Sequence, residues 1–156
     1  MTAVQYWTNR FPFPKLFKAQ DIQKHFSGLL KRANMDPRAF VGVYIATPRQ
    51  IALRNFPRKR STDTLSFPYH DPLLSESTVD STTVTESSSS SDWCLGEIIV
   101  CPERICKGRR HGLLIRRRLQ ALLTHGFVHL LGYDHHTREE WLQMRLVEKR
   151  LYYKKE

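Results

Sequence analysis

Two histidines that could bind a metal ion together, His125 and His129, stand four residues apart in a stretch of helical pattern. This spacing places both imidazoles on one face of a helix, one turn apart, where they can hold the same ion. Gly132 follows and can adopt the left-handed conformation that ends a helix, so that the chain turns back and brings His135 beside the other two. We therefore expect a site formed by three histidines.

The type and number of these residues favour zinc. Three neutral imidazole nitrogens suit Zn²⁺, and a set of three ligands leaves a fourth position open for water, which is typical of a catalytic site. We expect one zinc ion at His125, His129 and His135, with His136 as the alternative third ligand. Asp134 is expected to orient an imidazole or to cap the next helix. The competing interpretation is that these are ordinary histidines of a half-buried helix.

The residue after the first histidine excludes one familiar class of zinc enzyme. A protease of the HExxH type needs a glutamate directly after the first histidine as its general base. This chain has Gly126 at that position. A general base must come from elsewhere, or the substrate is of another kind.

The charge of the chain points to a polyanionic substrate. There are 25 Lys and Arg against 15 Asp and Glu, which gives a formal net charge of +10. Two basic clusters contain no acidic residue: Arg54, Arg58, Lys59 and Arg60, and Arg104, Lys107, Arg109, Arg110, Arg116, Arg117 and Arg118. A charge run is often only a solvated face, but two runs with this net charge favour binding to nucleic acid.

The elements that must position these residues can be located from hydrophobic periodicity. A helix is expected from Asp21 to about Asn34, and another from about Leu113 to Leu131. A last helix should begin after Thr137, because Thr137 and Glu140 form a capping-box pattern. Three apolar segments predict strands: 41–46, 64–67 and 95–100. We therefore expect one α+β domain over residues 1–156, with helices flanking a small sheet.

Composition sets further bounds. With 40% hydrophobic residues the chain can form a core, whereas its longest apolar runs are far shorter than the ~20 residues of a membrane span.

Residues 75–91 are mostly Ser and Thr and are expected to form a disordered loop insertion, either a spacer or a phosphorylated segment. Residues 1–18 are basic and lack acids, as organelle transit peptides do, but they are poor in Ser and contain Pro12 and Pro14. We expect them to be the first segment of the domain itself, with a transit role as the alternative. The three cysteines are expected to be reduced thiols.

Residues 125–135, HGFVHLLGYDH, resemble the hallmark H-G-x-x-H-L-x-G-[YF]-x-H of the YbeY family of metal-dependent endoribonucleases, which are tied to ribosomal RNA maturation. Two upstream blocks agree in order. Residues 61–68, STDTLSFP, are similar to the family's P-T-D-V-L-S-F-P, and residues 95–98, LGEI, to its L-G-D-I. The resemblance extends from about residue 41 to residue 151, and it implies a small mixed sheet flanked by helices with the metal site open to a basic groove.

The sequence departs from the family pattern at three places. The family has an arginine implicated in activity before its T-D-V-L-S-F block. The loop here is shorter, so Arg54, Arg58 or Arg60 could fill that role, and we assign it to Arg58. Glu97 replaces the usual aspartate, which keeps a carboxylate but lengthens its reach. The Ser/Thr-rich insertion is additional.

These observations and the resemblance lead to one functional expectation. We expect a zinc-dependent, single-strand-selective endoribonuclease that processes ribosomal RNA and acts with the small ribosomal subunit, with a ribosomal protein or a GTPase as a further partner. The alternative is a non-catalytic RNA-binding assembly factor with a structural metal. The expected location is the mitochondrion, with the cytoplasm or a plastid as alternatives, and no membrane association is expected.

Overall fold

The computed structural model describes residues 3–6, 18–58, 60, 62–69 and 93–153. The insertion expected at 75–91 lies outside the described residues, as does most of the segment 1–18. None of the helices described has both the length and the apolarity needed to cross a bilayer.

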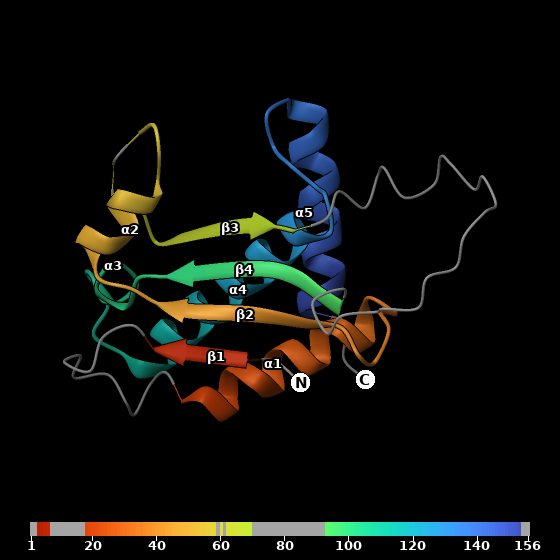
Figure 1. Ribbon diagram of the computed structural model, residues 1–156, viewed down its shortest axis with the longest axis horizontal. Coiled ribbons are helices and arrows are strands. Elements are labelled where there is room, and N and C mark those ends of the chain that lie inside the picture. Colours follow the sequence, from red (N-terminus) through yellow and green to blue (C-terminus); the bar gives the residue numbers. More distant parts are fainter. Residues whose placement is uncertain (1–2, 7–17, 59, 61, 70–92, 154–156) are drawn as a thin grey trace, which may run out of the picture.

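Four strands form one mixed sheet in the order β1-β2-β4-β3 (Figure 1). Their bounds are β1 (Ala3–Tyr6), β2 (Phe40–Ile45), β3 (Thr64–Pro68) and β4 (Cys94–Val100). β1, β2 and β4 run parallel, and β3 is antiparallel to β4. The three strands predicted from apolar runs are confirmed, whereas β1 was not predicted.

Three long helices carry most of the remaining structure: α1 (Ala19–Arg32), α4 (Gly112–Leu130) and α5 (Arg138–Tyr153). All three were predicted; the short α2 (Pro48–Arg54) and α3 (Pro102–Cys106) were not. The capping box before α5 is confirmed, because the backbone N–H of Glu140 donates to Oγ1 of Thr137 at 3.2 Å. The Glu140 carboxylate in turn accepts from the backbone N–H of Thr137 at 3.0 Å.

The core lies between the sheet and the helices α1 and α4. Alternate β2 residues such as Val43 turn toward these helices and are fully buried, together with Ile98 of β4. Phe26 of α1 and Phe127 of α4 meet edge to face, with ring centroids 6.3 Å apart. A smaller cluster around Ile51 of α2 covers part of the opposite face of the sheet. The predicted α+β class with a small mixed sheet is therefore confirmed.

Gly126 allows α4 to approach the sheet closely. A Cβ atom at this position would lie 2.9 Å from Oγ of Ser66 on β3 and 3.0 Å from Cδ1 of Ile98 on β4. Any side chain here would push the helix away from these strands. This close approach leaves no room at residue 126 for the glutamate of the HExxH pattern, and it sets the part of α4 that carries His125 and His129 beside β3.

All three cysteines are free thiols, as expected. Cys94, the first residue of β4, and Cys101, which links β4 to α3, are buried, and Cys106 is partly buried at the end of α3. None of them lies in the histidine cluster.

Candidate metal centre

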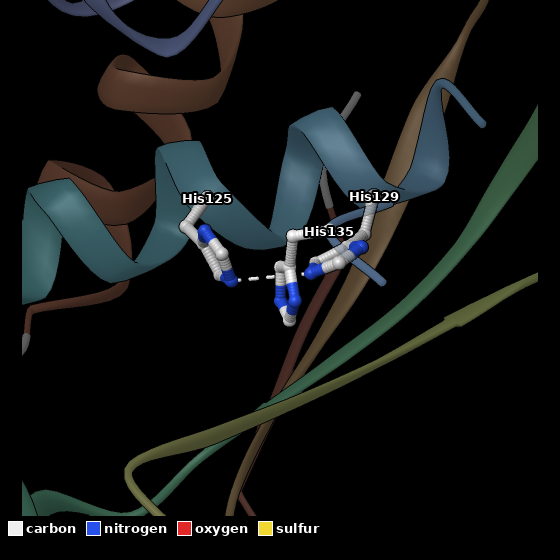
Figure 2. A group of neighbouring side chains, drawn as sticks. All are labelled: His125, His129 and His135. Atoms are coloured by element: carbon white, nitrogen blue, oxygen red, sulfur yellow. Dashed lines mark hydrogen bonds between the residues drawn. The ribbon is translucent and has the colours of Figure 1, made fainter. Parts of the chain in front are cut away.

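Helix α4 and the turn after it bring the three predicted histidines together. His125 and His129 lie one turn apart near the end of α4. Gly132 has φ of 96°, the left-handed conformation expected of it, and its N–H donates to the carbonyl of His129 at 2.9 Å. The turn places His135 beside the other two, and the ligating atoms of the three side chains all lie within 4.8 Å of one another. Figure 2 shows the three imidazoles turned toward a common point beside the helix.

A backbone contact sets the tautomer of His129. Its Nδ1 lies 2.9 Å from the carbonyl oxygen of Tyr133. Because a carbonyl can only accept, Nδ1 must carry the proton and donate it. The lone pair of His129 therefore lies on Nε2, the atom that faces the cluster.

Glu148 sets the tautomer of His125 in the same way. Oε1 of this α5 residue lies 2.5 Å from Nδ1 of His125. An ionised carboxylate can only accept, so His125 donates from Nδ1 and presents a lone pair on Nε2. Such carboxylate–histidine pairs accompany most metal-bound histidines, because they orient the ring and raise its basicity.

The spacing of the two Nε2 atoms fits a metal ion. They lie 3.1 Å apart. Two nitrogens bound tetrahedrally to zinc at about 2.0–2.1 Å would be separated by about 3.3 Å. Two lone pairs that face each other at this distance repel unless a cation or a proton lies between them. The donor set therefore fits a metal ion.

The surroundings of His129 favour the neutral form that can bind a metal. Burial lowers the pKa of His129 below its usual value, and the neighbouring His125 and His135 lower it further. A neutral imidazole is the species that coordinates, so little proton release is needed when an ion binds at neutral pH.

Glu148 is a site residue that motif reasoning missed. Burial raises its pKa, but the hydrogen bond from His125 and the charge of Arg145 outweigh this, so that the pKa lies below its usual value. Nη1 of Arg145 donates to Oε2 of Glu148 at 3.2 Å. The signal in the sequence was the position of Glu148 on the buried stripe of α5, four residues after the buried Met144 and three before the buried Leu151. A carboxylate on an apolar stripe needs a partner.

Asp134 and His136, the residues on either side of His135, lie outside the cluster of three histidines. His136 is exposed, and its Nε2 pairs with Oδ2 of Asp134 at 2.9 Å. The other carboxylate oxygen of Asp134 accepts from the backbone N–H of His135 at 2.8 Å. Asp134 thus fixes the turn that carries His135 instead of orienting the ring of a clustered histidine.

A hollow of about 630 Å³ opens in front of the three histidines. Ser66 of β3, Tyr133 and Arg58 are among the residues that line it. Of the described members of the first basic cluster, only Arg58 reaches this hollow. The structure thus brings Arg58 to the same hollow as the three histidines, while its catalytic role stays a prediction.

The second basic cluster does not form one surface. Arg116 lines a hollow between α1 and α4, whereas Arg117 and Arg118 line a groove between α4 and α5. Nη2 of Arg118 donates to Oδ2 of Asp63 at 2.9 Å, so this arginine anchors the segment that leads into β3. A run of consecutive arginines on a helix is divided between faces because each residue turns about 100° from the last.

Glu97, at the position of the family aspartate, lies away from the metal centre. Its carboxylate accepts a hydrogen bond from the Tyr44 hydroxyl at 2.8 Å on the face of the sheet opposite α4. It is not among the described residues that line the histidine hollow.

Comparison with known proteins identifies the family that the chain is similar to. The sequence model of the family described as Endoribonuclease YbeY matches residues 8–155. A protein of Dehalococcoides mccartyi named Endoribonuclease YbeY is 34% identical over 131 residues, which cover 80% of this chain and 79% of the relative. Proteins of the same name are 37% identical over 94 residues in Syntrophomonas wolfei, covering 60% of this chain and 56% of the relative, and 43% identical over 65 residues in Bdellovibrio bacteriovorus, covering 40% and 43%.

Proposed function

This chain belongs to the YbeY family of endoribonucleases, hydrolases of phosphodiester bonds, and on this premise we propose that it is a zinc-dependent endoribonuclease selective for single-stranded RNA. Its substrate is ribosomal RNA, on which it acts together with the small ribosomal subunit. The metal ligands are His125, His129 and His135.

One observation carries the proposal. Two histidine nitrogens with fixed lone pairs face each other at 3.1 Å, with a third histidine beside them, at the edge of a hollow that an arginine also lines. A metal ligated on one side and open to a hollow on the other suits hydrolysis better than a closed structural site. The positive side chain supports a phosphate-containing substrate.

The donor set supports zinc as the ion, because all three donor atoms are nitrogens. In addition, the tautomers of His125 and His129 each leave a lone pair directed at the same point. When bound, the ion would polarise a phosphate oxygen or lower the pKa of a water. Glu148 holds His125 in the ligating tautomer. Arg58 interacts with charge that develops on the phosphate during bond cleavage.

Selectivity for single strands is supported by the aromatic side chain that lines the hollow. Tyr133 is 39% exposed and lies among the residues that surround the histidines. Proteins that bind unpaired RNA stack its bases on such rings, which a duplex does not offer. The net charge of +10 supports attraction to the phosphate backbone.

The test is a cleavage assay with the metal-loaded protein and its His129→Ala variant, on matched single-stranded and double-stranded RNA. We expect cleavage of the single strand by the native protein, little cleavage of the duplex, and loss of cleavage in the variant. Equal cleavage by both proteins would assign the activity to a contaminant. Metal binding without cleavage would favour a non-catalytic assembly factor.

The partners and the location follow as further parts of this proposal. We propose contact with the small ribosomal subunit through a ribosomal protein or an assembly GTPase. We also propose a mitochondrial location, supported by the acid-free, basic composition of residues 1–18, of which Ala3–Tyr6 form β1 and so belong to the folded domain. Co-sedimentation with small subunits and imaging of a C-terminal fluorescent fusion test the two statements separately. Cytoplasmic or plastid fluorescence would overturn the second.

A further inference from the structure

Two further hollows lie next to the one at the metal centre, and the proposed function gives them no role. A hollow of about 200 Å³ shares His125 and His135 with the hollow at the metal centre. It also shares Arg145 and Glu148 with a third hollow of about 710 Å³ between α4 and α5. The shared residues place the three hollows next to one another, in a row that starts at the histidines and follows α5 toward its C-terminal end.

The far hollow of this row, the groove between α4 and α5, is positively charged. Arg117 of α4 and Lys149 of α5 line it, and both are exposed. Among the described residues, neither of them forms an ion pair. Among the described residues that line this groove, the one carboxylate belongs to Glu148, which His125 and Arg145 already engage. The groove therefore presents cations that are available to an anion.

Two aromatic side chains stand at the end of the same groove. Tyr152 and Tyr153 both line it, and their rings meet edge to face with centroids 4.8 Å apart. Tyr153 is 71% exposed, while Tyr152 is half-buried and supports it from one side. Tyr153 lies one helical turn after Lys149, so a ring and a cation share one face of α5.

Cations beside a supported, exposed ring are the elements that bind an unpaired nucleic acid strand, the cations through phosphates and the ring through a base. We infer that single-stranded RNA leaves the metal centre along the α4–α5 groove, with its backbone on Arg117 and Lys149 and a base stacked on Tyr153. This subsite rests on the proposed function, because it extends the path of the same substrate.

The aromatic part of the inference is tested by fluorescence anisotropy with labelled oligouridine, which has no duplex structure, and the metal-loaded full-length chain. Tyr153→Ala should weaken binding about tenfold, the effect typical of one lost base–aromatic stack. Tyr153→Phe keeps the ring and should bind like the native protein. Gel analysis after each titration verifies that the RNA is intact. Equal affinity of Tyr153→Ala and the native protein would overturn the stacking site.

The charged part is tested through salt dependence, with a control that the chain itself provides. Lys149→Gln combined with Arg117→Gln should flatten the slope of log affinity against log salt by about 1.4, since each phosphate contact on a single strand contributes about 0.7. Lys24→Gln combined with Arg116→Gln removes the same charge from the hollow between α1 and α4. An equal change of slope in both pairs would mean general attraction and would overturn the groove.

Cleavage assays on the same variants separate this inference from the proposed function. Tyr153→Ala should raise KM and leave kcat unchanged, because it lies away from the histidines. A native protein that cleaves RNA, with a Tyr153→Ala variant of unchanged KM, would discard the groove and leave the function standing. Binding that depends on Tyr153 in a protein that never cleaves would discard the function and leave the groove. If the groove variants no longer bind small subunits but bind oligouridine like the native protein, the groove is a site for a protein partner and the inference is overturned.

Discussion

Glu148 and His125 are joined by a 2.5 Å hydrogen bond across 23 residues of sequence, and this contact links α5 to the metal centre on α4. The carboxylate fixes the proton of the imidazole on Nδ1. The ligating nitrogen, Nε2, is thereby turned toward His129. The metal centre consequently depends on the docking of a helix that supplies no ligand.

The first prediction concerns this contact. Glu148→Gln should lower metal affinity about 10- to 100-fold, the usual effect of removing the carboxylate behind a ligating histidine. Competition with a chromogenic chelator measures it. Glu139→Gln, an exposed position on the same helix, is the control and should bind metal normally. If Glu148→Gln and Glu139→Gln bind metal with affinities within twofold of each other, other contacts hold the His125 ring.

The second prediction concerns the third ligand. His135→Ala should lose most bound metal because it removes one member of the cluster, whereas His136→Ala should retain it because His136 pairs with Asp134 outside the cluster. Metal analysis of the purified variants decides between them. Retention by His135→Ala together with loss by His136→Ala would reverse the assignment.

The third prediction concerns Arg58. If its side chain acts on charge developing at the phosphate, Arg58→Ala should lower the cleavage rate at saturating RNA about 100-fold or more, with metal content unchanged. Arg60→Ala is the matched control, since Arg60 does not line the histidine hollow in the part of the chain that the structure describes. Normal cleavage by Arg58→Ala and slow cleavage by Arg54→Ala or Arg60→Ala would show that the family arginine is placed wrongly.

The fourth prediction concerns the close approach of α4 to the sheet. Gly126→Ala should destabilise the fold by about 1–3 kcal/mol, because the new methyl group would meet the fully buried Ile98. Urea unfolding measures this. Gly28→Ala on α1 meets only the guanidinium of Arg32, whose Nε donates to the carbonyl of Leu151 at 2.6 Å, and should change stability less than Gly126→Ala. Equal stability of Gly126→Ala and the native protein would mean that the helix can shift without cost.

The fifth prediction concerns His25, whose Nε2 lies 3.1 Å from Oγ1 of the buried Thr124. Burial, aided by the charge of Arg32, lowers the pKa of His25 to about 4. Since the unfolded chain takes up this proton near pH 6.5 and the folded chain does not, stability should fall as pH drops from 6.5 toward 4. Between pH 7 and pH 5 the loss should be about 2 kcal/mol.

His25→Gln, which cannot titrate, should remove this part of the pH dependence. Urea unfolding at both pH values, with EDTA present so that metal release adds nothing, measures the difference from the native protein. His111→Gln removes an exposed histidine and should leave the dependence unchanged. The same slope in His25→Gln and the native protein would show that the folded state also binds the proton.

The clustering of the histidines was predictable because it depends on local geometry. His125 and His129 meet through helical spacing, and Gly132 reverses the chain within a few residues, so short-range rules were sufficient. Glu148 was not predicted because its contact depends on how α5 packs on α4, and no spacing rule fixes that angle. The alternative of half-buried, non-ligating histidines is weakened by the two fixed tautomers.

The distribution of the basic residues shows the same limit. Arg116, Arg117 and Arg118 are neighbours in sequence, yet the structure places them against different helices. Only the docking of α1 and α5 on either side of α4 decides this. The short helices α2 and α3 were missed because one or two turns carry too little helical periodicity, and β1 because AVQY lacks the apolar run that indicated β2 and β4.

The left-handed turn at Gly132 also has a consequence for how the protein acquires its metal. It keeps all three ligands within residues 125–135, so a chain that has not yet folded loses little loop-closure entropy when these side chains gather around an ion. The unfolded chain can then bind an ion as well, but more weakly, because the contact of Glu148 with His125 forms only when α5 docks on α4. Because the unfolded chain competes for the ion, added metal should raise the melting temperature less than its affinity for the folded protein alone would give.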